Sequence, residues 1–336
     1  MDMSFVRTVL GDIRPQEMGL TYSHEHIVIE ESFPTLANPA FILNDTLRIG
    51  AELKELYQSG GRTMVDTMPA ACGRNILKLA EVSQSSGINI IAPTGIHLEI
   101  YYPPNHWRYH LSVEELTELF INDITEGVDE CDYCCPVVKR TAHKAGMIKL
   151  ATDDEKITDH QKKIFEAVVN AHRETGAPIL THTNGGKLAM KQVELFTKLG
   201  ADLNHVVISH VDKQRDLTFH HDLMQTGVYV EYDSHFRLMA KGDDWTYQLL
   251  ESMLPHYSDR MVIGMDMAKN TYWKSYGGKP GLNYLLNEFR QELETRGIVN
   301  FFQKMFFTNP QHLYYSLTNT YFICSLIGSA CWLWFG

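Results

Sequence analysis

Short apolar runs rich in β-branched residues alternate along the chain with longer stretches whose apolar positions recur at a helical period. Runs of this length bounded by glycine are typical of buried strands. The predicted strands span residues 24–29, 62–67, 88–94, 147–151, 178–182, 205–210, 228–233 and 261–266. Most of them follow a glycine closely, as expected where a helix ends and the chain turns into the next strand.

Predicted helices fill the gaps between these strands. Val113–Glu126 has a clear start, because Ser112 can cap it and Glu115 follows three residues later, which makes a capping box. The other predicted helices span 47–58, 75–85, 159–175, 187–199, 217–225, 245–254 and 282–296. This alternation predicts an α/β fold, a (β/α)8 TIM barrel over residues 1–317. A doubly wound open sheet is the alternative, but no GxGxxG or P-loop pattern follows the first strand.

Composition and charge narrow the class of protein. The chain has 336 residues, 44% hydrophobic and 21% charged, which fits one large barrel with loop insertions. A net charge of −11 argues against a nucleic-acid partner but allows a local basic pocket for a small anionic substrate. The first residues lack the apolar core of a secretory signal, and six cysteines are then expected as reduced thiols, so we predict a cytoplasmic protein.

The C-terminal residues 318–336 form a separate apolar tail. Residues 321–336 read YFICSLIGSACWLWFG and carry no charge. This stretch is shorter than the roughly 20 residues that a spanning helix needs, so no membrane partner is expected. Packing on the barrel, a homodimer contact and contact with a membrane surface all stay open for it.

Polar side chains at the ends of the predicted strands carry the candidate chemistry. His24 and His26 are two residues apart, so on a strand they face the same side and can aim at one point. The others that close later strands are Lys149, His182, His210 and Asp266. A lone histidine in such a place is usually a hydrogen-bonded core residue. The carboxyl ends of barrel strands share one mouth, however, and burying so many polar groups there is costly unless metal ions satisfy them.

Lys149 needs a separate explanation, because an ammonium group repels metal cations. A desolvated lysine loses its proton readily. The free amine can then add carbon dioxide and become a carbamate, an anion whose two oxygens can bridge two divalent ions. The alternative is an ordinary ion pair of Lys149 with Asp66 or Asp266 inside the barrel.

Several segments resemble the signatures of the phosphotriesterase family, within the amidohydrolase superfamily. LTYSHEHI at 20–27 resembles the opening signature of that family, and AGMIKLAT at 145–152 resembles its bridging-lysine segment. The remaining similar segments are ILTHT at 179–183, ISH at 208–210, IGMD at 263–266 and the Asn309-Pro310 pair. They occur in the family's order and cover about residues 5–317.

The resemblance implies a binuclear metal centre. The more buried ion would be held by His24, His26 and Asp266, and the more exposed ion by His182 and His210. Carbamylated Lys149 and a hydroxide would bridge the two ions, which acidify the water and polarise the substrate oxygen. Asp266 could also accept or pass on a proton. We expect two zinc ions, with manganese or cobalt as alternatives, because mixed nitrogen and oxygen ligands suit all three metals.

Cations near the strand ends suggest the substrate. Lys213, Lys241 and Lys269 follow strands six, seven and eight, and Arg237 lies near them. Barrel loops in this region often bind phosphate, although solvated surface lysines are the alternative for each one. The segment 265–278 resembles the branch of the family that opens phosphorylated sugar lactones. We therefore predict a metal-dependent hydrolase that opens such a lactone by attack of the bridging hydroxide.

Other functions remain open at this point. An aryldialkylphosphatase-type phosphotriesterase or a general lactonase would use the same metal centre. A cyclic amidohydrolase such as a dihydroorotase also has these ligands, but the surrounding segments favour the phosphotriesterase branch. A non-catalytic protein on this barrel would be expected to have lost a ligand, and none is missing here.

Overall fold

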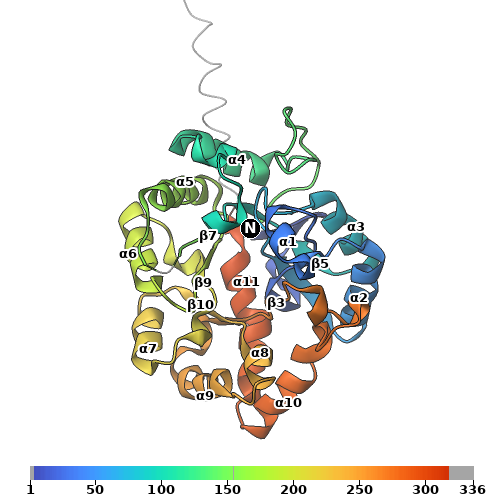
Figure 1. The fold of residues 1–336 in the computed structure, drawn as a ribbon. Coiled ribbons are helices and arrows are strands. Elements are labelled where there is room, and N and C mark those ends of the chain that lie inside the picture. The colour runs from blue at the N-terminus through green and yellow to red at the C-terminus, as the bar shows by residue number, and fades with distance from the viewer. Residues whose placement is uncertain (1–3, 154, 318–336) are drawn as a thin grey trace, which may run out of the picture.

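The structure, a computed structural model, describes residues 4–153 and 155–317, and the predicted apolar tail 318–336 lies outside them. Parallel strands form the centre of the molecule, and helices surround them (Figure 1). The strands are β3 (Leu20–Glu25), β4 (Gly61–Asp66), β5 (Asn89–Ile91), β6 (Pro93–Gly95), β7 (Met147–Ala151), β8 (Ile179–His182), β9 (Val206–Ile208), β10 (Tyr229–Tyr232) and β11 (Met261–Ile263). The surrounding helices include α2 (Thr46–Gln58), α3 (Ile76–Ser86), α4 (Val113–Thr125), α5 (Asp159–Thr175), α6 (Ala189–Leu199), α7 (Leu217–Gln225), α9 (Trp245–Tyr257) and α10 (Glu288–Thr295).

Neighbouring strands pair in the order that a barrel requires. One sheet runs β3-β4-β5 and the other β6-β7-β8-β9-β10-β11, with parallel pairing throughout. Only Ala92 separates β5 from β6. On the other side, the backbone N–H groups of Met265 and Asp266 donate to the His24 carbonyl at 3.2 and 2.9 Å. The predicted (β/α)8 fold is confirmed.

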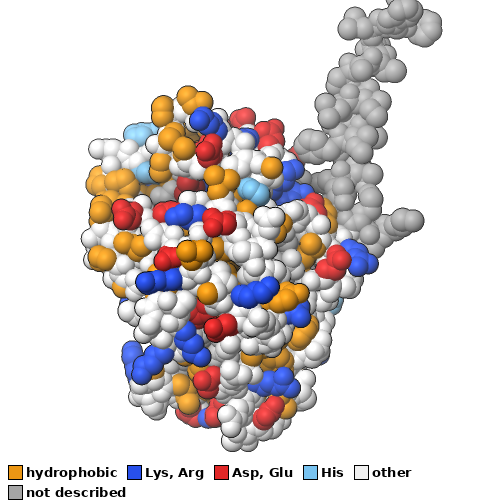
Figure 2. Space-filling view, turned by 90° about the vertical axis from the view of Figure 1, so that its right-hand side faces the viewer, with side chains coloured by type: hydrophobic (Ala, Val, Ile, Leu, Met, Phe, Trp, Pro, Cys, Tyr) orange, Lys and Arg blue, Asp and Glu red, His pale blue; other side chains and the backbone are white. Residues whose placement is uncertain are grey.

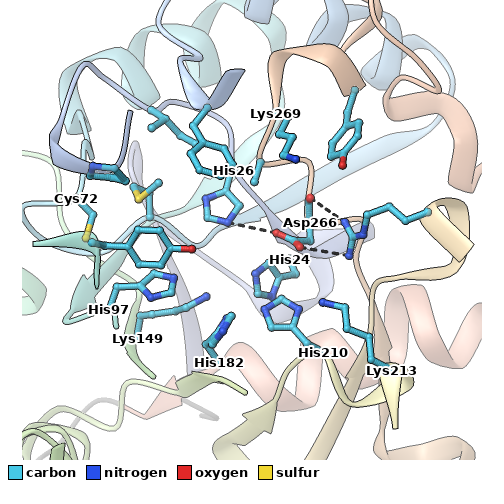
Figure 3. A pocket seen from close by; sticks show the side chains of 18 residues that line it. His24, His26, Cys72, His97, Lys149, His182, His210, Lys213, Asp266 and Lys269 are labelled. Carbon is cyan, nitrogen blue, oxygen red and sulfur yellow. Dashed lines mark hydrogen bonds and ion pairs between the residues drawn. The ribbon is translucent and has the colours of Figure 1, made fainter. Parts of the chain in front are cut away.

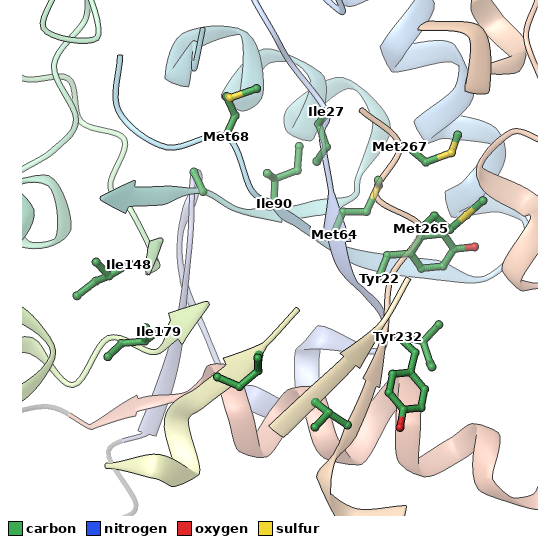
Figure 4. Packing of buried hydrophobic residues seen from close by; sticks show 14 of the residues in the cluster. Tyr22, Ile27, Met64, Met68, Ile90, Ile148, Ile179, Tyr232, Met265 and Met267 are labelled. Carbon is green, nitrogen blue, oxygen red and sulfur yellow. The ribbon is translucent and has the colours of Figure 1, made fainter. Parts of the chain in front are cut away.

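The inward and outward faces of the strands build two separate apolar layers. The inner layer takes one residue from each of seven strands and fills the barrel below the carboxyl ends of the strands. Its members are Val65, Ile91, Met147, Leu180, Val207, Tyr229 and Val262. Leu313 and Tyr314 of α11 (Asn309–Tyr314) complete it from below. The outer layer packs against the helices, and Figure 4 shows Ile90, Ile148 and Ile179 in it. Lys149 and His182 each follow an inner-layer residue by two positions. Alternation along the strand therefore turns them to the inside of the barrel, nearer the carboxyl ends of the strands than that layer.

Several predicted boundaries were wrong, and two of them differ most from the structure. The first strand begins at Leu20 and ends at Glu25, so His26 lies just beyond it; the Ile27 N–H donates to the Asp66 carboxylate at 2.8 Å instead of continuing the ladder. The predicted helix 282–296 is a 3-10 turn at Leu282–Leu285 followed by α10. That turn is held by Glu52 of α2, whose carboxylate accepts the Leu282 N–H at 2.9 Å.

Several elements were not predicted from the sequence. They are the hairpin β1 (Ser4–Thr8) and β2 (Gly11–Ile13), the strand β12 (Ser316–Leu317) paired with β1, and the short helices α1 (Phe33–Ala37), α8 (His235–Met239) and α11. The Asn309-Pro310 pair begins α11, and the Asn309 amide donates to the carbonyls of Ser258 and Met261 at 2.8 and 2.6 Å. This side chain therefore ties α11 to the start of β11.

The surface fits the composition. Basic and acidic side chains are interspersed on the face shown in Figure 2. In the described part of the chain, no helix is long and apolar enough to cross a membrane.

Candidate metal centre

The six polar residues predicted from the strand ends lie around one cavity at the carboxyl ends of the strands (Figure 3). His24 lies in β3 and Lys149 in β7, and His182 ends β8. His26, His210 and Asp266 follow the ends of β3, β9 and β11 by one to three residues. The cavity has a volume of about 210 Å³, which suits a small molecule rather than a polymer.

Two overlapping groups of side chains have the spacing of a metal site. The ligand atoms of His24, His26 and Asp266 all lie within 4.8 Å of one another, and so do those of His24, His210 and Asp233. The His26 Nε2 and Asp266 Oδ1 atoms are 3.4 Å apart. The ring centroids of His182 and His210 are 4.6 Å apart, which places His182 at the edge of the same cluster.

Buried carboxylates behind the cavity orient two of the histidines. Nδ1 of His24 lies 2.7 Å from a carboxylate oxygen of Glu231, and Nδ1 of His210 lies 2.7 Å from one of Asp233. Each contact leaves the Nε2 atom of the ring for the cavity. Carboxylates in this position fix the tautomer and raise the basicity of a ligating imidazole.

The titration behaviour of the cluster suits a divalent cation. Burial, followed by the nearby charge of Lys149, lowers the pKa of His24 well below its usual value, and burial has the same effect on His182. Burial alone would raise the pKa of Asp266, but the Arg237 guanidinium, 3.3 Å from its carboxylate, helps to hold that pKa well below the ordinary range. Neutral imidazoles and an ionised carboxylate are the forms that bind metal.

Lys149 is 1% exposed, and burial lowers its pKa to about 8 although nearby carboxylates such as Glu231 and Asp266 raise it. A lysine on the surface would hold its proton far more tightly. At neutral pH a measurable fraction of the Lys149 side chain is therefore the free amine, which is the form that carbon dioxide can modify. The residues present thus fit a metal centre with a modified lysine.

The three predicted phosphate-binding lysines are not placed alike. Lys213 and Lys269 line the cavity. Lys241 is exposed and is absent from the cavity lining, so the structure does not support its predicted role. The reason is α8, which directs Arg237 toward Asp233 and Asp266 and ends before Lys241.

The cavity also contains residues that sequence reasoning did not select. His97, Tyr101 and Tyr272 line it, together with Met68 and Cys72. His97 could have been found by the same rule as the ligands, because it lies two residues after β6. The predicted strand ended at Thr94, however, so the position of His97 just after a strand end was not recognised. The two tyrosines come from 3-10 turns in long loops, for which the sequence offers no comparable signal.

Comparisons with known proteins agree with this geometry. The profile of the phosphotriesterase family matches residues 4–314. A phospho-furanose lactonase of Mycoplasmopsis synoviae (strain 53) is 30% identical over 313 residues, covering 89% of this chain and 88% of the relative. The crystal structure of an amidohydrolase from Mycoplasma synoviae superposes with a TM-score of 0.90 at 28% identity, covering 95% of this chain and 94% of that one. The structure of a lactonase from Listeria monocytogenes superposes with a TM-score of 0.84 at 27% identity, covering 92% and 98%.

The barrel and its cluster of histidines and aspartate at the carboxyl ends of the strands define a metal-dependent hydrolase. Within that class, the chain belongs to the phosphotriesterase family.

Proposed function

We propose that the protein hydrolyses a lactone, and that this lactone carries a phosphate on its sugar ring. The observation that carries the proposal is the shared cavity, in which the ammonium groups of Lys213 and Lys269 and the metal-ligand cluster line one space. A lactone carbonyl and a phosphate on one small molecule would match these two parts. The similarity to a phospho-furanose lactonase and to a lactonase of known structure supports the same substrate class.

The metal centre would hold two divalent ions, zinc in our proposal, with manganese or cobalt as alternatives. His24, His26 and Asp266 would bind the more buried ion. His182 and His210, whose rings lie side by side, would bind the more exposed ion. When bound, such ions activate a water molecule and polarise the substrate carbonyl.

Lys149 would join the two ions as a carbamate. Its free amine would attack the carbon of carbon dioxide, so that a nitrogen–carbon bond forms while one carbon–oxygen π bond opens and its electron pair moves to oxygen. The nitrogen would then lose one proton to water, and the side chain would change from a base to an anion. The burial of Lys149 and its lowered pKa support this step. Without the modification, a protonated Lys149 would repel both ions.

Asp266 would move the proton during ring opening. Its carboxylate would take a proton from the attacking water and return it to the ring oxygen that leaves. Arg237 would hold the carboxylate in place, because the guanidinium also donates to the Asp266 carbonyl at 3.0 Å. Lys213 and Lys269 would bind the phosphate and so fix which end of the substrate enters the metal site.

Turnover of matched lactones tests the proposal. The metal-loaded protein is assayed on sugar lactones with and without a phosphate, and kcat/KM is compared within each pair. We expect a preference of at least about tenfold for the phosphorylated member, the equivalent of one charged hydrogen bond. Equal values would indicate a general lactonase, and no turnover of any lactone would refute the proposal.

A phosphotriesterase activity is the second candidate, because part of the cavity lining is apolar and aromatic. Phe41, Met68 and Tyr101 line it and could contact the apolar arms of a phosphotriester. Turnover of paraoxon-like esters above that of every lactone would favour this candidate.

The cytoplasmic location and the homodimer remain proposals. The free thiols of Cys72, Cys131, Cys134 and Cys135 support a reducing compartment. We propose no nucleic-acid partner, because the net charge is −11.

A further inference from the structure

His97 lies in the wall of the cavity, although it belongs to neither group of potential metal ligands in the described chain. It follows β6, and 8% of it is exposed. Its ring centroid lies 5.1 Å from that of His182 and 4.3 Å from that of Tyr101. Figure 3 shows its imidazole beside Lys149.

Hydrogen bonds around His97 determine which ring nitrogen carries the proton. The Leu98 backbone N–H donates to Nδ1 of His97 at 2.7 Å. A nitrogen that accepts a hydrogen bond in this way has no proton of its own, so the ring is neutral and its proton lies on Nε2. That Nε2–H makes no hydrogen bond to another residue of the described part of the chain.

The position of the ring is fixed before any ligand arrives. The His97 backbone N–H donates to the Tyr102 hydroxyl at 2.9 Å, and that hydroxyl donates to the Ala70 carbonyl at 3.0 Å. The Tyr101 ring packs against the imidazole in an edge-to-face arrangement, at an interplanar angle of 70°. A donor held by the protein in this way needs no reorganisation when charge develops on a substrate.

We infer that His97 is a catalytic hydrogen-bond donor whose Nε2–H binds the carbonyl oxygen of the lactone. This inference rests on the proposed function. The hydrogen bond strengthens as the carbonyl carbon becomes tetrahedral and its oxygen gains negative charge. The phosphate is a less suitable acceptor for this N–H. The proposed phosphate-binding residues Lys213 and Lys269 follow β9 and β11. His97 follows β6, which is at the other end of that sheet and next to β7, the strand of Lys149.

Two substitutions at one position separate the donor from the ring. His97→Phe keeps an aromatic ring against Tyr101 but removes the donor. His97→Gln supplies an amide N–H near the place of Nε2. We expect His97→Phe to lower kcat for the lactone by about 100- to 1000-fold with little change in KM, as for the loss of one oxyanion donor. His97→Gln should recover at least about tenfold of that loss.

A matched control exists at the opposite end of the barrel. His205 packs its ring edge to face against Tyr315 at 4.7 Å, and its Nδ1 lies 2.9 Å from the Leu313 carbonyl. His205→Phe should leave kcat and KM unchanged. Metal content and Tm are measured for every variant, and His97→Phe should keep the metal content of the wild type.

Three outcomes would overturn the inference while the proposed function stands. They are a kcat within threefold of wild type for His97→Phe, loss of metal from that variant, and a His97→Gln variant no better than His97→Phe. A wild-type protein that opens no lactone in the same assay would instead refute the proposed function, and the role of His97 with it.

Discussion

An amine buried inside a barrel behaves differently from a lysine on the surface. Water no longer solvates the ammonium form of Lys149, so burial lowers its pKa to about 8. The nearby carboxylates, such as those of Glu231 and Asp266, raise this pKa but do not fully offset the effect of burial. The chemistry proposed for this residue therefore depends on its surroundings rather than on the amino acid alone.

Lys149→Ala tests the proposed bridge. We expect the variant to lose metal and to fall in activity by more than about a hundredfold, a larger loss than removal of an outer hydrogen-bond partner causes. Acetate or propionate should restore part of both, because a short carboxylate can occupy the space of the carbamate. Lys149→Glu serves as the comparison and should keep some activity. Full activity of Lys149→Ala would rule out the bridge.

A pair of lysines tests the phosphate site. Lys213 lines the cavity, whereas Lys241 is exposed and outside its lining. Lys213→Ala should cost about 1.5–3 kcal/mol of binding, the range for hydrogen bonds to charged groups. This corresponds to about ten- to hundredfold in kcat/KM for the phosphorylated lactone. Turnover of the unphosphorylated lactone should hardly change.

Lys241→Ala is the matched control and should change neither substrate by more than about twofold. An equal loss on both substrates in Lys213→Ala would show that Lys213 supports the metals or the fold instead. A large loss of kcat/KM in Lys241→Ala on the phosphorylated lactone alone would show that Lys241 does bind the phosphate.

At the scale of elements, the approach of neighbouring strands positions the candidate catalytic groups. Gly95 of β6 lies beside Lys149 of β7 and has a φ of +105°. A Cβ atom there would come within 1.9 Å of the Lys149 carbonyl oxygen. Only glycine allows this approach, and Lys149 depends on it for its place in the barrel.

Gly95→Ala should therefore destabilise the protein by at least about 3 kcal/mol, the upper range for overpacking. The reason is that the clashing Lys149 carbonyl oxygen belongs to the backbone and cannot move aside by a change of rotamer. Gly200, at the end of α6, offers the control: its φ is +81°, and an added Cβ would meet nothing within 4 Å. Gly200→Ala should cost about 1–2 kcal/mol, the strain of the left-handed conformation alone. Urea denaturation of both variants measures the difference, and equal losses would contradict the role given to Gly95.

For the whole molecule, we expect bound metal to contribute to the stability of the fold. The proposed ligands come from strands distant in the sequence, so ions that bind only the folded state stabilise the entire barrel. At 100 times the dissociation constant, a ligand contributes about 2.7 kcal/mol. For a chain of this size that is about 5 °C in Tm, at roughly 2 °C per kcal/mol.

Removing the metal with a chelator should thus lower Tm by about 5 °C or more, and adding zinc should reverse the change. Elemental analysis of the loaded protein should find close to two equivalents of divalent metal per chain. Less than one equivalent after growth with added metal, or an unchanged Tm after chelation, would argue against the binuclear centre.

The sequence alone determined the alternation of strands and helices, because hydrophobic periodicity is a local property that buried strands and helices must satisfy. It also singled out the residues at strand ends, since the spacing of His24 and His26 and the common mouth of a barrel follow from backbone geometry. The periodicity did not reveal where an apolar segment breaks, as the division of 282–296 into a 3-10 turn and α10 shows. There the decisive contact was made by Glu52, far away in the chain.

Only the tertiary structure decided which side chains of the loops reach the cavity and in what chemical form. Lys213 and Lys241 are equivalent in the sequence, but the path of α8 separates them. The tautomer of His97 follows from its contact with the Leu98 N–H, and the pKa of Lys149 from its burial among several strands. These properties are sums over neighbours that come together only when the chain folds, and no local pattern of residues records them.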